Sequence, residues 1–279
     1  MRTPDQLVAQ TTELVALPEI YWELRRLMEN PDVTVAEFAG LIRLDPGLST
    51  KLLQISNSAF YGLSRRVETV SYAVNILGTS LIHDLVLATA VTRGFAGISS
   101  EIENLGKFWR RSVYCGLSAR ALAARAQLLD SERVFTAGML HDIGHLVLCL
   151  RAPEQLRLAL ALCAAQRRPL DEVQRESWGY DSGAVGQRLM AAWRLPLSLQ
   201  EAAGYCRRPG KALEFRLETA IVHVAWRLAM QMEKGDEFEA FAPFDPAVSE
   251  VLVCSDQDLQ AARAAATELL PDTLALFVH

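Results

Sequence analysis

The chain has 279 residues, enough to bury one large or two small cores, and its 51% hydrophobic and 22% charged residues are typical of a globular protein. A net charge of −5 gives no reason to expect nucleic acid or a membrane surface as the main partner, and no apolar run approaches the roughly 18 residues that span a bilayer. Five cysteines without a close pair argue against a disulfide framework, and the N-terminus lacks a hydrophobic signal core, so we expect a reduced, cytoplasmic protein.

Helix signals follow one another through the first hundred residues. Apolar residues recur at helical spacing, Thr34–Glu37 fits a capping box, and Asp45-Pro46 joins an N-cap to a proline at the first helical position. Thr69 or Ser71 can cap a short helix that Gly78 would close. We predict helices over residues 5–29 (two helices, divided at Leu17-Pro18), 34–43, 46–56, 70–77 and 80–93.

The same signals continue to the C-terminus. Asp130–Glu132 can cap one helix, Pro153 and Pro169 each open another, and Ser255–Asp258 forms a second capping box. No convincing alternating strand and no short-period repeat occurs, so the predicted fold is all-α. We predict helices over residues 105–128, 131–150, 153–166, 169–177, 183–193, 195–205, 213–232 and 256–270.

Three potential metal ligands stand together in the apolar run Ala137–Val147. If the helix is continuous, His141 and His145 lie one turn apart on the same face, with Asp142 about 100° around the axis. Imidazole and carboxylate ligands suit zinc, iron or manganese. The run is therefore either half of a metal site or a core histidine with an acidic neighbour, and the decision depends on ligands from elsewhere in the chain.

Several blocks, in one order, resemble the HDOD domain, a signalling relative of the HD metal-dependent phosphohydrolases. The resemblance covers roughly residues 11–230, and a lone His-Asp pair would be far weaker evidence than this series. The blocks are Leu17-Pro18, Glu37-Phe38-Ala39, Asp45-Pro46-Gly47-Leu48-Ser49, Lys51-Leu52-Leu53, Asn57-Ser58-Ala59-Phe60-Tyr61, Ala73-Val74-Asn75-Ile76-Leu77-Gly78, Phe108-Trp109-Arg110-Arg111-Ser112, Gly138-Met139-Leu140-His141-Asp142-Ile143-Gly144 and Trp193-Arg194-Leu195-Pro196.

With the resemblance, the predicted architecture is a two-lobed helical protein. We expect an N-terminal helical lobe over residues 1–100, an HD-like helical lobe over 101–235 and a C-terminal helical extension over 236–279. Gly94–Ser100 is the best linker candidate, and Lys234–Pro246 is a polar, proline-bearing loop. Movement of the lobes around the linker is a plausible way to transmit a signal.

The resemblance also implies which ligands an active site would need. An HD hydrolase holds its metal with a histidine from one helix, the His-Asp pair from a second and an aspartate from a later helix. Arg111 stands at the place of the first histidine and Trp226 at the place of the last aspartate. Auxiliary histidines of such relatives correspond here to Cys206, Arg207 and Ser182.

These departures predict that no metal and no other cofactor is bound. A guanidinium repels a divalent cation, and an indole does not ligate one. We therefore interpret His141 and Asp142 as a structural remnant, with Asp142 paired to Arg111 in the old metal position. His145 is expected to face the helix surface or a loop, with metal ligation as the alternative.

Other chemically suggestive residues have simpler interpretations. His83-Asp84 is expected on a solvated helix face, and Asn57 is expected to bond the backbone of its turn. Trp109, Trp178, Trp193 and Trp226 are expected to be core anchors. Four arginine pairs would face solvent, with a phosphate or nucleotide site as the alternative; they are Arg65-Arg66, Arg110-Arg111, Arg167-Arg168 and Arg207-Arg208.

The resemblance implies bacterial signal transduction. Our leading hypothesis is a stand-alone, non-catalytic regulatory module that binds other signalling proteins, with cyclic-di-GMP signalling proteins among the candidates. The alternative is a metal-dependent phosphohydrolase acting on a nucleotide or cyclic dinucleotide, with His145, Glu176 or Asp181 as substitute ligands. A third hypothesis is a small-molecule sensor that uses the vacated metal cavity as its pocket. The sequence names no partner, pathway or oligomeric state.

Overall fold

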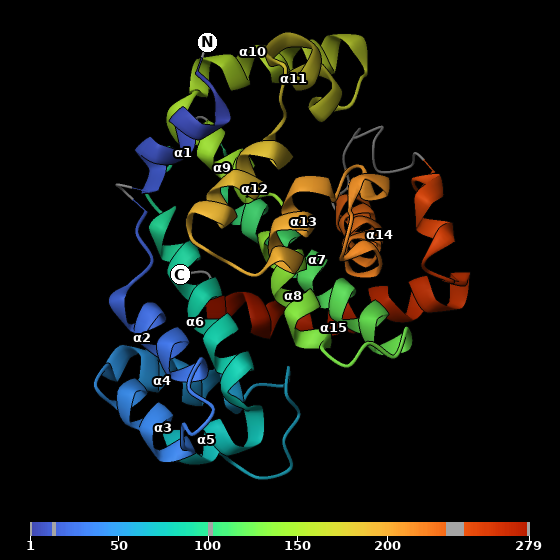
Figure 1. Cartoon of the computed structure of the whole chain (residues 1–279). Coiled ribbons are helices and arrows are strands. Elements are labelled where there is room, and N and C mark those ends of the chain that lie inside the picture. Colours follow the sequence, from blue (N-terminus) through green and yellow to red (C-terminus); the bar gives the residue numbers. More distant parts are fainter. Residues whose placement is uncertain (1, 13–14, 100–102, 233–242, 278–279) are drawn as a thin grey trace. The chain divides into compact units, whose positions relative to one another are not determined.

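A computed structural model describes residues 2–12, 15–99, 103–232 and 243–277, and all regular structure in these ranges is helical (Figure 1). The all-α prediction is confirmed. Along the same ranges, no single helix combines the length and the apolar content of a membrane span; α5 and α6 reach them only as a pair, which bends by 108°. Ser100 of the predicted linker and residues 234–242 of the predicted polar loop lie outside the described ranges.

Most helices begin where the sequence signals predict. Thr34 and Glu37 form the capping box, Asp45 accepts from the backbone of Leu48, and Thr69 is the cap of α5. The helices are α1 Pro4–Thr12, α2 Glu19–Met28, α3 Val35–Arg43, α4 Pro46–Ser56, α5 Val70–Leu77, α6 Thr79–Gly94, α7 Leu105–Arg125, α8 Ser131–Leu140, α9 Ile143–Arg151, α10 Pro153–Gln166, α11 Leu170–Trp178, α12 Ser182–Ala192, α13 Leu197–Tyr205, α14 Arg216–Met232 and α15 Asp256–Phe277, with short 3₁₀ turns η1 Pro209–Lys211 and η3 Pro246–Glu250.

Two predicted helices differ from those observed. The predicted helix over residues 131–150 is two helices, because Asp142 leaves the helical conformation (φ −110°, ψ 23°) and the backbone N–H of His145 bonds to its carbonyl at 2.9 Å. His141 and His145 therefore do not share the face of one continuous helix. The last helix runs through Pro271 to Phe277, beyond the predicted end at residue 270.

The chain divides into two compact units. The larger unit comprises Met1–Val15 and Phe95–Glu268, and the smaller unit comprises Ala16–Gly94 and Leu269–His279. This grouping differs from the predicted ranges at both ends of the chain. In the larger unit α1 packs against α9 and α12 through buried Leu7 and Val8, which explains why the first residues group with the second half of the chain.

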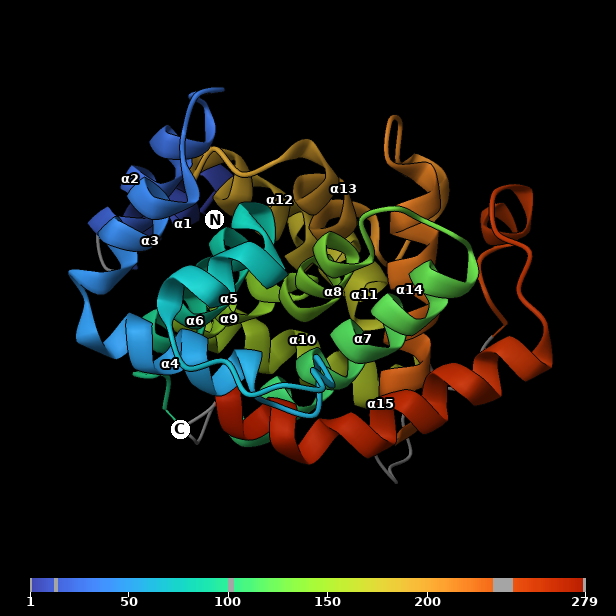
Figure 2. The same cartoon turned by 90° about the horizontal axis from the view of Figure 1, so that it is seen from below.

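Helix α7 forms the centre of the larger unit, with α8 and α14 packed along it (Figure 2). A Cβ atom on Gly138 would lie 2.9 Å from the Cα of Gly116, so these two glycines let α7 and α8 approach closely. A Cβ atom on Gly144 would lie 1.9 Å from the carbonyl oxygen of Ser182, where α9 meets α12. Close backbone packing on both sides thus fixes the junction of α8 and α9.

The smaller unit is a bundle of α2–α6 around Leu24, Phe38 and Ile82. His83 and Asp84 are buried, with 6% and 9% of their surface exposed, so the predicted solvated face is wrong. The reason is that α6 is covered nearly all round, and His83 Nδ1 finds its partner in Asp84 at 3.3 Å.

The prediction for Asn57 is confirmed. Its side-chain amide donates to the carbonyls of Leu53 and Val67, each at 2.8 Å, and its oxygen accepts from the backbone of Val67 at 2.8 Å. Asn57 thus closes the turn after α4 and holds residue 67 against the end of that helix.

Candidate functional site

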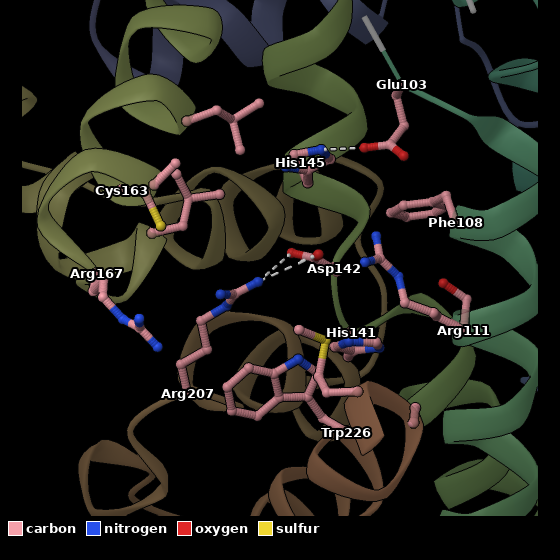
Figure 3. A pocket seen from close by; sticks show the side chains of 16 residues that line it. Glu103, Phe108, Arg111, His141, Asp142, His145, Cys163, Arg167, Arg207 and Trp226 are labelled. Atoms are coloured by element: carbon pink, nitrogen blue, oxygen red, sulfur yellow. Dashed lines mark hydrogen bonds and ion pairs between the residues drawn. The ribbon is translucent and has the colours of Figure 1, made fainter. Parts of the chain in front are cut away.

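A cavity of about 560 Å³ lies in the larger unit, where α7, α10, α11 and α14 surround the junction of α8 and α9 (Figure 3). The structure brings the predicted site residues together here, since His141, Asp142, His145, Arg111 and Trp226 all line the cavity. It adds residues that the sequence analysis did not assign to this site or did not mention: Glu103, Phe108, Ser112, Leu160, Cys163, Ala164, Arg167, Leu170, Arg207, Ala229 and Met230.

His141 ends α8 and is buried. Its Nδ1 lies 2.7 Å from the carbonyl oxygen of Gly138, so Nδ1 carries the proton and donates it to that carbonyl. This tautomer leaves the lone pair on Nε2. Burial lowers the pKa of His141, which opposes the raising effect of the neighbouring Asp142 carboxylate. The imidazole is therefore neutral at physiological pH.

Asp142 forms its ion pair with Arg207. Both carboxylate oxygens lie 3.4 Å from Nη2 of Arg207 (Figure 3). The hydroxyl of Ser182 donates to Oδ1 of Asp142 at 3.5 Å. Burial alone would raise the pKa of Asp142, but the positive charge of Arg207 and, to a smaller extent, that of Arg111 bring it below its ordinary value. The sequence analysis named Arg111 as the partner of Asp142; the structure adds Arg207 as an ion-pair partner, and Arg111 lines the same cavity.

The indole ring of Trp226 packs against the guanidinium of Arg207 in this ion pair. The guanidinium carbon of Arg207 lies 5.0 Å from the centre of the indole ring, and that of Arg227 lies 5.3 Å from it. Trp109, Trp193 and Trp226 are buried, as predicted for core anchors, whereas Trp178 is only half-buried. Trp226 is thus both a core residue and the surface on which Arg207 rests.

His145 does not face the surface, and that prediction is wrong. It is 6% exposed, its Nε2 lies 2.8 Å from Oε2 of Glu103, and its ring stacks on Phe108. Burial acts to lower the pKa of His145, but hydrogen bonds to Cys149 and Glu103 outweigh it and raise the value to about 10. The imidazole is therefore protonated, and it forms an ion pair with Glu103.

Glu103, His145 and Cys149 each place one potential ligand atom within 4.8 Å of the others. Cys149 follows His145 by one helical turn, so the sequence contained that half of the signal. Glu103 lies 42 residues earlier, and no local pattern links it to His145. The contact that the structure shows within this group is the hydrogen bond between His145 and Glu103.

The other two substitute ligands, Glu176 and Asp181, are paired with arginines, although Asp181 lines a small second pocket together with His141 and Asp142. Glu176 pairs with Arg168 at 2.6 Å and is not part of the cavity lining. Asp181 is buried and caps α12, and it pairs with Arg175 at 2.7 Å and Arg208 at 2.8 Å. Neither residue lies in the lining of the main cavity beside His141 and Asp142.

Three of the four arginine pairs contribute one member each to the cavity: Arg111 from α7, Arg167 from the end of α10, and Arg207 from the turn after α13. Arg167 caps α10 in the left-handed conformation (φ 50°, ψ 49°), which costs a non-glycine residue roughly 1–2 kcal/mol. Arg111 and Arg207 are partly buried, so the expectation that they face solvent is wrong for them, whereas Arg167 is exposed as predicted.

Comparison with known proteins adds a family assignment. The model of the HDOD domain family matches residues 14–209. An uncharacterised protein of Treponema pallidum (strain Nichols) is 28% identical over 203 residues, which cover 68% of this chain and 39% of that protein. The chain thus spans well under half the length of this curated relative.

Three solved structures share the fold. An HDOD domain protein of unknown function from Geobacter sulfurreducens superimposes with a TM-score of 0.77 at 21% identity, covering 99% of each chain. A protein from Shewanella amazonensis SB2B, provisionally named a phosphohydrolase, gives 0.68 at 24% identity over 95% of this chain and 97% of its own. One from Marinobacter aquaeolei VT8, provisionally assigned to signal transduction, gives 0.74 at 22% identity over 99% and 60%.

Proposed function

The chain belongs to the HDOD domain family, which is related to the HD metal-dependent phosphohydrolases, and on that premise we propose that it is a non-catalytic signal-transduction module that regulates other proteins by binding them. The proposal concerns the region that the family shares, residues 14–209, and the helices that complete the cavity. Signalling proteins, those of cyclic-di-GMP pathways included, are the proposed partners.

The pairing of Asp142 with Arg207 is the observation that carries this proposal. A catalytic metal needs about three protein ligands and an open position for water. The residues at the corresponding place offer Nε2 of His141 and a carboxylate already bonded to a guanidinium. Arg111 and Trp226, which stand where the HD relatives have further ligands, line the same cavity, and neither side chain ligates a cation. The residues present therefore fit a catalytic metal poorly.

A cytoplasmic location is part of the same proposal. All five cysteines are free thiols, which is in keeping with a reducing compartment.

Metal analysis of protein purified without a histidine tag tests the proposal. We expect far less than one equivalent of iron, manganese or zinc per chain, and no hydrolysis of nucleotide or cyclic dinucleotide substrates after any of these ions is added. About one equivalent of tightly held metal, together with hydrolysis that a chelator abolishes, would overturn it.

The alternative of a metal-dependent phosphohydrolase retains one favourable observation, the cluster of Glu103, His145 and Cys149 beside Asp142. Cysteine, histidine and glutamate are all zinc ligands. If this alternative holds, Cys149→Ser removes bound zinc from the purified protein. Under the non-catalytic proposal the same substitution leaves the metal content unchanged, because there is none to lose.

A further inference from the structure

Three guanidinium groups from distant parts of the chain meet at one cavity. Arg111, Arg167 and Arg207 are carried by α7, by the end of α10 and by the turn after α13 (Figure 3). The cavity volume of about 560 Å³ lies in the range of small-molecule sites. Like charges gathered around a cavity repel one another, so this arrangement favours an anion as its occupant.

The fixed charges of the lining agree with an anionic occupant. Three guanidinium groups stand against the two carboxylates of Glu103 and Asp142, which leaves a surplus of one positive charge. A phosphomonoester brings three acceptor oxygens to the guanidinium groups, whereas a carboxylate brings two and carries less negative charge.

The backbone of Arg167 allows the contribution of its side chain to be tested. Arg167 occupies a left-handed helix cap, where glycine is the least strained residue, and its side chain lines the cavity. Gln127 and Arg194 have the same conformation without lining the cavity, so the conformation by itself marks no site. Replacing Arg167 by glycine therefore removes a guanidinium from the cavity without straining the cap.

The remaining wall shapes the rest of the occupant. Leu160, Leu170 and Met230 give one side of the cavity an apolar surface. The indole ring of Trp226 contacts the guanidinium groups of Arg207 and Arg227, so we do not expect an aromatic ring of the occupant to stack on it. An occupant therefore has a charged head toward the arginines and an apolar body toward α10 and α14.

We propose that this cavity binds a small phosphomonoester with an apolar body, its phosphate held among Arg111, Arg167 and Arg207. The assignment rests on the proposed function in one respect, since it gives an anion the place of a catalytic metal. Arginine suits the task because its planar guanidinium forms paired hydrogen bonds with phosphate oxygens. The ligand then becomes the signal that the module reads.

Calorimetric titration of the full, chelator-treated chain with phenyl phosphate tests this. We expect binding in the millimolar range or tighter, weaker binding of inorganic phosphate and benzoate, and none of phenol. Arg167→Gly should lower the affinity for phenyl phosphate at least about tenfold, since a hydrogen bond to a charged group is lost. It should also raise the melting temperature, because the backbone strain at residue 167 is relieved. Arg167→Gln, which keeps the strain, should weaken binding equally without raising the melting temperature.

Gln127→Gly is the matched control. Gln127 is exposed, has the same left-handed conformation (φ 57°) and does not line the cavity. The Gln127→Gly substitution should raise the melting temperature as Arg167→Gly does and leave the affinity for phenyl phosphate unchanged. Absence of phenyl phosphate binding, equal binding of benzoate, or equal affinity of the Arg167→Gly and Gln127→Gly variants would overturn the assignment. Metal-dependent release of phosphate from phenyl phosphate would instead overturn the non-catalytic function and leave the binding site standing.

Discussion

The carboxylate of Asp142 lies 3.4 Å from the guanidinium of Arg207, and the two groups neutralise each other at the edge of the cavity. In the HD relatives that the sequence resembles, the corresponding carboxylate is a metal ligand. Here the same carboxylate fixes an arginine, and the arginine in turn rests on Trp226. Removing either partner should therefore change both the charge of the cavity and the stability of the fold.

Arg207→Gln is expected to lower the free energy of unfolding by about 2 kcal/mol at neutral pH, because it leaves a buried carboxylate without its main counter-charge. The pKa of Asp142 in the folded state is below its ordinary value of 3.8, so the stabilisation is present above pH 3.8 and disappears as the pH falls through the lower folded-state value. Denaturant unfolding from pH 2 to 7 measures this. A double-mutant cycle with Asp142→Asn that gives no coupling would contradict it.

Glu103→Gln is expected to lower the free energy of unfolding, with a pH dependence opposite to that expected for Arg207→Gln. The pKa of His145 is raised from an ordinary value of 6.5 to about 10, so the ion pair contributes fully below pH 6.5 and is lost as the pH rises toward 10. The loss on substitution should be about 3 kcal/mol at pH 6 and much smaller near pH 10. NMR titration of the imidazole in the wild type and the variant gives the pKa directly. A wild-type His145 that titrates near 6.5 would contradict the ion pair.

Gly144→Ala is expected to cost about 3 kcal/mol or more, because its Cβ would lie 1.9 Å from the carbonyl oxygen of Ser182 and neither backbone can move without separating α9 from α12. Gly186→Ala is the control on the facing helix, where the nearest atom to the new Cβ is 3.2 Å away. Thermal unfolding should therefore show a large drop for the first variant and a much smaller one for the second. Equal effects would mean that the helices are free to adjust.

Asn57→Ala is expected to lower the free energy of unfolding by about 2 kcal/mol, since it removes three hydrogen bonds to the backbone of residues 53 and 67. Asn75→Ala is the control, an exposed asparagine in α5 of the same unit. Urea unfolding of both variants measures the difference. An Asn57→Ala variant as stable as Asn75→Ala would show that water replaces the lost bonds.

The sequence contained most of the local structure because helix ends follow short-range chemistry. Thr34, Asp45, Asp130 and Ser255 each cap the helix that they were predicted to begin. The boundary at residues 141–142 was missed, since the apolar pattern continues across it and the break depends on how tightly α9 packs against α12.

The site was predicted in part. The family blocks led to His141, Asp142, Arg111 and Trp226, which do share one cavity. The pairing within it was not predictable, because the carboxylate could meet either of two arginines and only the tertiary structure decides between Arg111 and Arg207. His145 and Glu103 are 42 residues apart in the chain, and no periodic pattern in the sequence predicts their contact. Burial of His83 was missed because α6 has no clear polar face.

The position of α1 has a consequence for how the chain folds as it is made. Helix α1 precedes the smaller unit in the chain, yet its buried residues pack against α9 and α12, which are synthesised only after residues 16–94 of the smaller unit. Until then its apolar side has no partner within the larger unit, and closing that contact spans more than half of the chain. The smaller unit also needs the segment Leu269–His279, which is made after nearly all of the larger unit. Helix α15 contributes to both units, so neither unit can be completed before α15 has been made.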